Sequence, residues 1–428
     1  MPTDEATASN QPSGSLCSTP VTIDDVRGVF GRHFRLNSVP ELADWSAKEI
    51  GGTQGFGSFM VRVTLHWKDA QYAEKLPKSV IVKIPTATKL SLMGNVNEMM
   101  VDLVNSMKTR IHKIHNCECS VYERFAQADR PSSIAIPTVY SWRRLTDAHS
   151  LERAEKAYLM MEDLSETAAT ISDPELAQRL TDEQIRQMIV AVATLHAWSC
   201  TATLDAIEFV RFEEIQAEML DNIDKSNDDF ERILAEDQQW RALLGEKLCG
   251  HAKRLRMGRA SLERMLALHR DFGIPDTMIH GDVYPNNVMF RKDEHGKATG
   301  DLVALLDWQL VQYGSPLYDI NGALSMSLNN ETQRTDAFRS AMLDVYYETF
   351  EKVLQKTPSF SRQQLGDAFE QVYILAARAL IPSMGGFVCA IREGNVPGYD
   401  NEKAAKQLMV DTKCMFSEVI QLMDKLKW

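Results

Sequence analysis

The sequence has no uninterrupted run of about 18 apolar residues, which is the length expected of a helix that crosses a membrane. Its start also lacks a basic stretch followed by an apolar core, because residues 1–20 are acidic, small and polar. These absences predict a chain without a membrane span or a secretory signal. The first 20 residues are predicted to form a disordered tail.

Cysteine and basic residues are also scarce. The seven cysteines are an odd number, lie mostly inside apolar segments, and occur in a chain too large to need disulfide bonds for stability. We therefore expect a protein of a reducing compartment, the cytoplasm. The 47 lysine and arginine residues are outnumbered by 59 aspartate and glutamate residues, which gives a formal net charge of −12. This balance argues against nonspecific binding to nucleic acid or to anionic membranes.

Apolar residues are numerous enough to form a substantial core. Hydrophobic residues make up 44% of the 428 residues and charged residues 25%, the proportions of an ordinary globular protein. Their arrangement predicts an α+β fold with a β-rich N-terminal lobe over residues 21–161 and a mostly helical C-terminal lobe over residues 162–428.

The N-terminal lobe begins with a helical spacing of apolar residues that extends over residues 21–47. The glycine cluster GGTQGFGS then precedes FMVRVTLHW, residues 59–67, whose apolar and polar residues alternate as in a half-buried strand. SVIVKIP, residues 79–85, predicts a second strand, and we expect the two strands to form an antiparallel pair with a glycine turn. The other predicted elements are a helix over residues 90–125 and strands over residues 137–142 and 157–164.

The C-terminal lobe contains two sequence signals for the start of a helix. Thr181 to Gln184 and Ser361 to Gln364 are capping boxes, in which the hydroxyl and the glutamine side chain bond early backbone N–H groups. Residues 205–247 and 325–356 are acidic and amphipathic, and they are also predicted to be mostly helical.

Two segments of the C-terminal lobe carry most of the chemistry. IHGDVYPNNVMF, residues 279–290, contains His-Gly-Asp with Asn287 five positions after Asp282. VALLDWQLVQYGSPLYDI, residues 303–320, places Asp307 after an apolar run that predicts a strand. Phosphoryl transfer requires a carboxylate that orients and deprotonates a hydroxyl, together with oxygen ligands for magnesium. By average residue usage, the first motif is expected by chance in about one in a thousand chains of this length.

These motifs resemble those of the aminoglycoside phosphotransferase and choline kinase-like superfamily, and within it the ecdysteroid kinase-like (CHK) small-molecule kinases of insects and nematodes. The resemblance covers most of the chain and implies a two-lobed protein-kinase-like fold, with ATP and Mg²⁺ as cofactors. It also implies that Asp282 is the catalytic base and that Asn287 and Asp307 are metal ligands. Asp319, in Pro-Leu-Tyr-Asp, matches a family element that we interpret as structural.

The same resemblance assigns nucleotide-binding residues to the N-terminal lobe. Lys83, on the strand SVIVKIP, would contact the α- and β-phosphates. Its expected partner is Glu118, in a helical pattern with Tyr122 four residues later. Glu162 and Leu164, at the end of a predicted buried strand, match the hinge whose backbone groups would bind adenine.

The sequence departs from the family pattern at two places. GGTQGFGSFMV is not a strict G-x-G-x-x-G, although Gly55, Gly57 and Ser58 lie where the phosphate-covering turn is expected. The family often has Leu-Trp after the His-Gly-Asp motif, where this chain has Val283 and Tyr284. That change falls beside the substrate, so the resemblance does not identify the acceptor.

Several other candidate residues have simpler explanations. His280 is interpreted as structural, with its ring packed against the strand that leads to Asp307. His112, His115 and Cys119 fall on one helical face, as zinc ligands could, but no second ligand cluster accompanies them in the sequence. The aromatic residues that could surround a quaternary ammonium ion are interpreted mainly as core: Trp198, Trp308, Tyr284, Tyr313 and Tyr318.

We predict direct transfer of the γ-phosphoryl group of Mg-ATP to a hydroxyl of a small molecule. A neutral, fairly apolar alcohol such as a steroid or a glycosylated metabolite is expected, because most carboxylates lie on predicted solvated helix faces. Residues 369–390 offer apolar and aromatic surface for such an acceptor: Phe369, Tyr373, Leu380, Met384 and Phe387. The alternatives are a choline or ethanolamine kinase, a pseudokinase that binds without turnover and, least favoured, a protein kinase.

Overall fold

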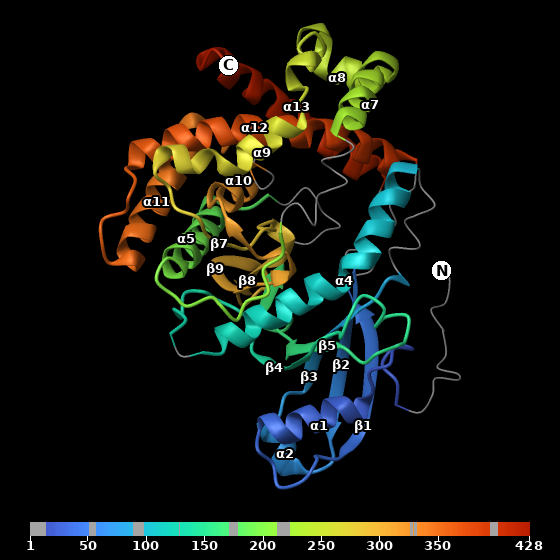
Figure 1. Cartoon of the computed structure of the whole chain (residues 1–428). Coiled ribbons are helices and arrows are strands. Elements are labelled where there is room, and N and C mark those ends of the chain that lie inside the picture. Colours follow the sequence, from blue (N-terminus) through green and yellow to red (C-terminus); the bar gives the residue numbers. More distant parts are fainter. Residues whose placement is uncertain are drawn as a thin grey trace.

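The computed structural model describes residues 14–50, 57–88, 98–127, 129–170, 179–211, 223–325, 328, 332–393 and 401–428. Its N-terminal part is built on a five-stranded antiparallel sheet (Figure 1). In spatial order the strands are β1 (Leu42–Ile50), β2 (Ser58–Trp67), β3 (Ser79–Pro85), β5 (Tyr158–Glu162) and β4 (Val139–Arg143). The predicted strand over residues 59–67 and the three others in this region are therefore confirmed.

Helices cover both faces of this sheet. One face packs against α1 (Ile23–His33), with Val61, Val63 and Phe30 in a shared core, and the short helix α2 (Ala70–Lys75) lies beside β2. The opposite face meets α4 (Glu98–Phe125), which crosses between the sheet and the rest of the chain (Figure 1). Lys83 and Ile81 lie on this second face, because side chains alternate along a strand.

Two predictions for the start of the chain were wrong in detail. The helix expected over residues 21–47 ends at His33, and residues 42–50 form β1 instead. This edge strand has the sequence LADWSAKEI, so it lacks the apolar alternation by which strands are recognised. The glycine segment consequently lies between β1 and β2, and β2 is connected to β3 through α2. Gly55 lies outside the described residues.

The expected tail does not extend to residue 20. Leu16 and Val21 are fully buried in the core between α1 and the sheet, and Ser15 pairs with Thr22 through an isolated bridge. These two apolar residues attach the segment to the N-terminal lobe. The sequence did not indicate this attachment because the residues around them are mostly polar.

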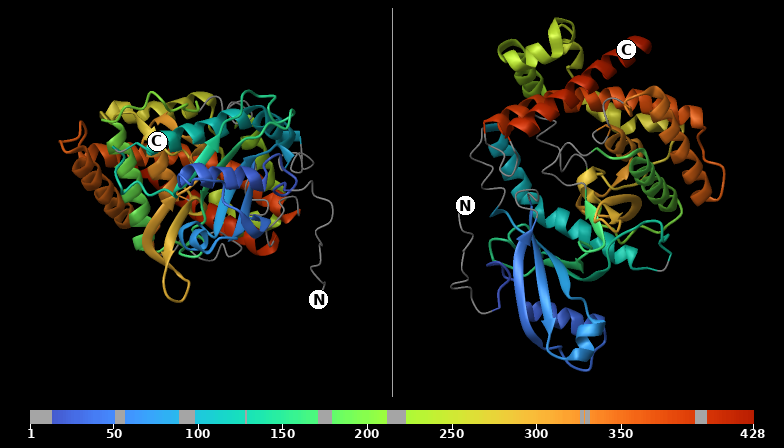
Figure 2. Two further views of the ribbon diagram at one scale, coloured as in Figure 1. Left: turned by 90° about the horizontal axis from the view of Figure 1, so that it is seen from below. Right: turned by 180° about the vertical axis from the view of Figure 1, so that it is seen from behind.

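The C-terminal part is mainly helical, with small sheets at its centre (Figures 1 and 2). Its helices are α5 (Asp182–Ser199), α7 (Ile223–Glu236), α8 (Gln238–Cys249), α9 (Arg259–Ala267), α10 (Leu317–Ser325), α11 (Asp336–Leu354), α12 (Arg362–Arg392) and α13 (Asn401–Lys425). Its strands are β6 (Ala168–Thr170), β8 (Val288–Lys292) and β9 (Ala298–Leu305) in one sheet, and β7 (Thr277–Ile279) and β10 (Gln312–Gly314) in another. Both predicted capping boxes are present, at the starts of α5 and α12.

One helix, α12, is long and apolar enough to cross a membrane by length and composition alone. The sequence did not predict this because charged residues such as Arg378 interrupt the apolar stretch. In the fold, α12 packs against α7, α9, α10, α11 and α13, and none of residues 368–392 is exposed. The neighbouring helices thus cover part of the apolar surface of α12, and 44% of its apolar window is buried.

Together these elements form an α+β fold of two lobes, one built on an antiparallel sheet and one mostly helical, as the sequence predicted. The antiparallel sheet and α4 form one lobe, and the helices around β7, β8 and β9 form the other. Figure 2 shows from behind that the sheet and the C-terminal helices lie at opposite ends of the molecule, with α4 between them.

Candidate active site

The His-Gly-Asp segment forms the loop after β7, and the buried side chain of Asp319 holds it in place. One carboxylate oxygen of Asp319 accepts the backbone N–H of His280 at 2.7 Å, and the other accepts that of Gly281 at 2.9 Å. His196 Nε2 also lies 3.1 Å from Asp319 Oδ2, and His196 Nδ1 lies 2.9 Å from the hydroxyl of Tyr346. Residues from three helices, α5, α10 and α11, therefore fix the backbone on which Asp282 is carried.

Gly281 is required at its position for two reasons. Its φ of +81° lies in the left-handed region that side chains rarely adopt, and a Cβ atom there would lie 2.2 Å from the carbonyl oxygen of Leu310. The segment after Asp307 and the His-Gly-Asp loop thus come together at a contact that only glycine permits.

Replacing Gly281 by alanine is expected to lower the free energy of unfolding by about 3 kcal/mol or more, from backbone strain plus a clash with backbone atoms. Gly296→Ala is the matched control, because Gly296 also has a positive φ of 77° but has no atom within 4 Å of the added Cβ. Gly296→Ala should lower the free energy of unfolding by only about 1–2 kcal/mol. Urea unfolding measures both variants, and equal losses would contradict the close contact at Gly281.

His280 makes the contacts of a structural residue. Its Nε2 lies 3.0 Å from the carbonyl oxygen of Leu306, and its ring centre lies 4.5 Å from that of Trp308. Its Nδ1 accepts the backbone N–H of Asp282 at 3.3 Å. Burial lowers the pKa of His280, so the neutral ring with a proton on Nε2 satisfies both contacts.

Asp282 and Asn287 point toward each other across the loop. The side-chain amide of Asn287 donates to the backbone carbonyl of Asp282 at 2.9 Å and to Asp282 Oδ2 at 2.8 Å. Burial, followed by repulsion from Asp307, raises the pKa of Asp282 to about 7, against the smaller lowering effect of the Asn287 hydrogen bond. A carboxyl group with this pKa is suited to exchanging a proton near neutral pH.

The raised pKa of Asp282 predicts a pH-dependent stability of the metal-free protein. Between about pH 4 and pH 7 the folded carboxyl keeps its proton while the unfolded one loses it, so stability falls as the pH rises through this window. The melting temperature of the wild-type protein should therefore decrease relative to that of Asp282→Asn between pH 5 and pH 7, and the difference should level off near pH 8. If the melting temperatures of the two proteins changed with pH in the same way across this range, the pKa of Asp282 would not be raised.

Asp307 brings the two lobes into contact. It follows β9 in a left-handed conformation, φ 64° and ψ 58°, which aspartate tolerates better than most residues. Its Oδ1 lies 2.5 Å from Lys83 Nζ, which in turn lies 2.6 Å from Glu118 Oε2. The predicted pair of Lys83 and Glu118 is thus formed, and it is buried. Burial alone would lower the pKa of Lys83, but Asp307 and Glu118 outweigh it and hold that pKa above its usual value.

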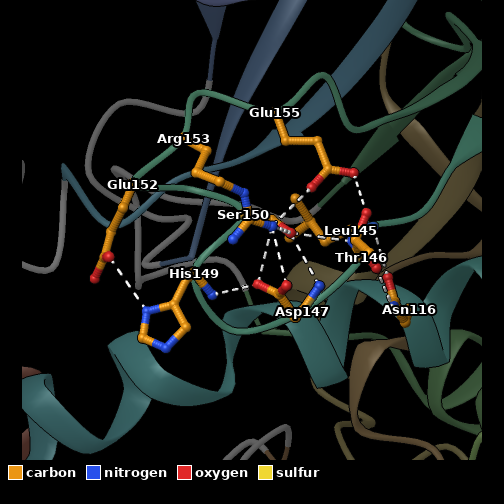
Figure 3. Close-up of polar contacts among 9 residues, drawn as sticks. All are labelled: Asn116, Leu145, Thr146, Asp147, His149, Ser150, Glu152, Arg153 and Glu155. Carbon is orange, nitrogen blue, oxygen red and sulfur yellow. Dashed lines mark hydrogen bonds and ion pairs between the residues drawn. The ribbon is translucent and has the colours of Figure 1, made fainter.

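The position of Glu118 on α4 is reinforced by the connection between β4 and β5. Asn116 donates to the carbonyl of Leu145 at 2.9 Å and accepts its N–H at 3.0 Å. Within the connection, Ser150 Oγ accepts the backbone N–H groups of Thr146 and Asp147. Figure 3 shows this loop lying over α4 with Asn116 reaching up to it. The loop therefore ties the helix that carries Glu118 to the sheet that carries Lys83.

The predicted hinge lies at the end of β5, where the chain leaves the sheet. Glu162 donates its backbone N–H to the carbonyl of Thr138 at 2.8 Å. The carbonyl of Leu164 accepts the N–H of Ala168 at 2.8 Å, so it closes a turn that leads into β6. Asp163, between them, forms an ion pair with Arg62 of β2 at 2.7 Å. The segment predicted to be the hinge is thereby connected to β2.

Of the predicted phosphate-covering turn, the structure describes the last residues, Gly57 and Ser58. Gly57 accepts the N–H of Thr86 through its carbonyl at 2.9 Å, and Ser58 is buried where β2 pairs with Pro85 of β3. A Cβ atom at Gly57 would make only ordinary contacts, 3.8 and 3.9 Å, with Ile114 and Ile111 of α4. These contacts place the end of the turn above α4, on the Lys83 side of the sheet.

A pocket of about 190 Å³ opens beside the His-Gly-Asp loop. It lies between that loop and the helices α9, α10 and α12, and its lining includes Met265, Tyr284, Asn321, Ser325, Leu380 and Ser383. Sequence reasoning had singled out only Tyr284 and Leu380 from this set. The others come from three helices, α9, α10 and α12, and no local motif connects them.

Two expectations from the sequence about the residues that line an acceptor pocket need correction. Phe369 and Tyr373 are buried in the core and do not line the pocket, because they lie about three and two turns nearer the start of α12 than Leu380 does. Of the five aromatic residues considered for a cation cage, Tyr284 and Tyr318 line the pocket, Trp198 and Trp308 are buried in the core, and Tyr313 is exposed.

The fold and this site define a two-lobed α+β protein in which a lysine–glutamate pair of the sheet lobe meets a carboxylate of the helical lobe. The chain matches, over residues 10–426, the model of the DUF1679 family, described as "Uncharacterized oxidoreductase dhs-27". It belongs to this family.

More distant likenesses are found among single proteins. The chain is 22% identical over 327 residues to "Uncharacterized kinase-like protein D1044.1" of Caenorhabditis elegans, covering 75% of this chain and 78% of that one. It is 11% identical to a putative aminoglycoside phosphotransferase of Ralstonia eutropha, covering 92% and 98% of the two chains with a TM-score of 0.42. It is 10% identical to an ethanolamine kinase of Plasmodium vivax, covering 90% and 86% with a TM-score of 0.41. Likenesses this distant do not define an activity.

Proposed function

We propose that this protein is a kinase that transfers the γ-phosphoryl group of ATP to a hydroxyl of an uncharged small molecule. The observation that carries the proposal is the convergence of Lys83, Glu118 and Asp307 at the junction of the two lobes. Asp282 and Asn287 lie on the loop against which the segment after Asp307 packs, and a pocket opens beside that loop. Each group required for phosphoryl transfer thus has a candidate within one small region.

The residues present fit a magnesium ion. Asp307 is partly exposed, at 29% of its side chain, and among the described residues its second oxygen accepts the amide of Gln309 alone. Asn287 uses its amide nitrogen for Asp282, which leaves the carboxamide oxygen as its metal-binding atom. In the described part of the chain no three His, Cys, Asp or Glu side chains form a metal cage, and Mg²⁺ commonly binds through one or two protein groups plus phosphates. When bound here, the ion would neutralise charge on the phosphates.

The chain's own residues have separate tasks in the proposed reaction. The acceptor oxygen bonds to the γ-phosphorus, the bond to the β-phosphate oxygen breaks, ADP leaves, and the hydroxyl proton passes to the carboxylate of Asp282. Lys83 supplies a positive charge to the phosphates, and Glu118 keeps its ammonium group in position. Glu162 and Leu164 would bind adenine through backbone groups, and Gly57 and Ser58 would border the phosphates.

An uncharged acceptor is favoured by the pocket lining. Asp319 is the only charged residue among the described residues that line the pocket, and both of its oxygens are already bonded to the His-Gly-Asp loop. A cationic acceptor such as choline or an aminoglycoside would lose its hydration there without gaining a carboxylate partner. A neutral alcohol, with steroids and glycosylated metabolites as examples, has no such cost.

The oxidoreductase in the family's description suggests a different function. Enzymes that bind nicotinamide dinucleotides on the common doubly wound fold use a parallel sheet with a glycine-rich turn. All the strand pairs among the described residues are antiparallel. The observed arrangement therefore favours the kinase over a dinucleotide-dependent oxidoreductase of that kind.

The proposal is tested by incubating the purified protein with Mg-ATP and a metabolite extract, and by searching for compounds whose mass increases by one phosphoryl group. We expect such a product to form with ATP and Mg²⁺ and to be absent when EDTA is added. Nucleotide binding without any product would indicate a pseudokinase. Binding of NADH without binding of ATP would support the oxidoreductase instead.

A further inference from the structure

Tyr284 lies on the loop that carries the proposed base, and backbone hydrogen bonds fix its place there. Its N–H donates to the carbonyl oxygen of Asp282 at 3.0 Å, and its own carbonyl oxygen accepts the N–H of Asn287 at 2.9 Å. Its backbone is extended, with φ −123° and ψ 160°, just before the short turn over residues 285–287. The position of Tyr284 is therefore defined relative to both Asp282 and Asn287.

The hydroxyl of Tyr284 is accessible and makes no hydrogen bond to any of the described residues. Tyr284 is partly buried and lines the pocket, and its hydroxyl is not among the unpaired polar atoms that burial hides from water. By contrast, the hydroxyl of Tyr122 is hidden in this way. The hydroxyl of Tyr347 donates to the carbonyl of Phe360 at 3.2 Å. A ligand in the pocket can therefore reach the hydroxyl of Tyr284 and bond to it without displacing a protein partner.

The surroundings of Tyr284 keep its hydroxyl protonated. Burial raises the pKa of Tyr284, and the neighbouring Tyr318, Asp282 and Asp319 raise it further. The phenol is therefore neutral near pH 7, and it has a proton to donate to an oxygen of a ligand.

The pocket itself has room for one small ring. Its volume of about 190 Å³ is below the range of about 300–1,000 Å³ that is usual for drug-sized ligands. Residues with hydroxyl groups line it from three elements: Tyr284 of the loop, Ser325 of α10 and Ser383 of α12. Ser383 donates to the carbonyl of Ala379 at 3.1 Å, so its oxygen can still accept a hydrogen bond. Such a lining fits a ring with several hydroxyl groups better than the fused apolar rings of a steroid.

We propose that Tyr284 determines acceptor specificity by donating a hydrogen bond from its phenolic hydroxyl to a second oxygen of the acceptor, close to the hydroxyl that is phosphorylated. The acceptor group is then an uncharged ring with neighbouring hydroxyls, as in the sugar of a glycoside. This inference rests on the proposed kinase function, because it takes the pocket beside the His-Gly-Asp loop as the acceptor site. Since the same loop carries Asp282, the bond to Tyr284 holds the reacting hydroxyl near the base.

The test measures binding of small probes, so that it does not depend on turnover. Ligand-observed NMR titrations would compare cyclohexanol with cis-1,2-cyclohexanediol, which differ by one neighbouring hydroxyl group. For the wild-type protein we expect the second hydroxyl to increase affinity about three- to tenfold, the value of one net hydrogen bond. Methyl β-D-glucopyranoside, a neutral sugar ring, should displace the diol.

Two variants with the same chemical change test the phenol itself. Tyr284→Phe keeps the ring and removes only the hydroxyl, so it should bind cyclohexanol and the diol equally. It should melt at the wild-type temperature, because the lost hydroxyl has no hydrogen bond among the described residues. Tyr313→Phe is the matched control, because Tyr313 is exposed on β10 and does not line the pocket. It should retain the preference for the diol.

The inference is overturned if the wild-type protein binds cyclohexanol and the diol equally or binds neither, if the glucoside does not displace the diol, or if Tyr284→Phe keeps the preference. Loss of the preference in Tyr313→Phe would also overturn it, because the effect would then not come from the pocket. Its failure is distinguishable from failure of the proposed function. Phosphorylation of an extract component together with equal binding of the probes would refute the role of Tyr284 alone. Absence of both ATP binding and phosphorylation would refute the kinase itself.

Discussion

Replacing Asp282 by asparagine is expected to lower kcat by about 100-fold or more while leaving the affinity for ATP nearly unchanged. The substitution preserves the shape of the side chain and an oxygen that can accept the amide of Asn287, but it removes the carboxylate that we propose receives the hydroxyl proton. The measurement is steady-state phosphorylation of an acceptor identified in the extract, together with calorimetric titration of ATP.

Asp293→Asn is the control for this change. Asp293 is exposed in the turn between β8 and β9, where it accepts the backbone N–H groups of His295 and Lys297. Asp293→Asn also removes a carboxylate, but outside the His-Gly-Asp loop. It should therefore leave kcat within about twofold of the wild-type value. A wild-type kcat for Asp282→Asn would exclude Asp282 as the base.

The second large effect is expected for Asp307→Ala, which should weaken magnesium-dependent ATP binding by about 100-fold or more. The variant removes the main carboxylate available to the metal and also one of the two partners of Lys83. Titration with ATP in the presence of Mg²⁺ and again with EDTA distinguishes the two contributions, since only the metal-dependent part should disappear completely.

Asp301→Ala provides the comparison on the same strand. Asp301 lies on β9, 74% of its side chain is exposed, and its nearest basic partner, Arg291, is 3.8 Å away. Its loss should not change the affinity for ATP measurably. If Asp307→Ala bound Mg-ATP as tightly as Asp301→Ala does, Asp307 would not belong to the metal site.

The sequence predicted those elements whose side chains alternate or repeat clearly. The strand that contains Val61 and Val63 was found because its apolar and polar residues alternate. The strand that contains Lys83 was found as a short run of β-branched residues, and α5 and α12 were found from their capping boxes. The edge strand β1 was missed because its exposed position allows it to be polar. Apolar and polar residues alternate because one face of a strand is buried. A strand that buries little surface therefore has no clear alternation in its sequence.

The same distinction applies to the site. The contact between Asp282 and Asn287 was predictable because the two residues lie within one short motif. The position of Asp307 at the end of a strand was predictable because it follows an apolar run. The pocket was not predictable, since its walls come from α9, α10 and α12. Its polar side chains, Asn321 and Ser325 on α10 and Ser383 on α12, are single residues within helices, and such residues have no pattern that would reveal a shared pocket.

The close approach of α10 to the His-Gly-Asp loop has a consequence for how such a protein could diversify. Asp319 and Gly322 couple this helix to the backbone of the loop, so changes along α10 would disturb the proposed phosphoryl transfer together with the proposed acceptor binding. The opposite wall, built by Met265 and Leu380, makes no such connection in the described contacts. Substitutions there could alter the shape of the acceptor that is admitted while the reacting groups stay in place. We expect natural variation in substrate range among related chains to concentrate on α9 and α12.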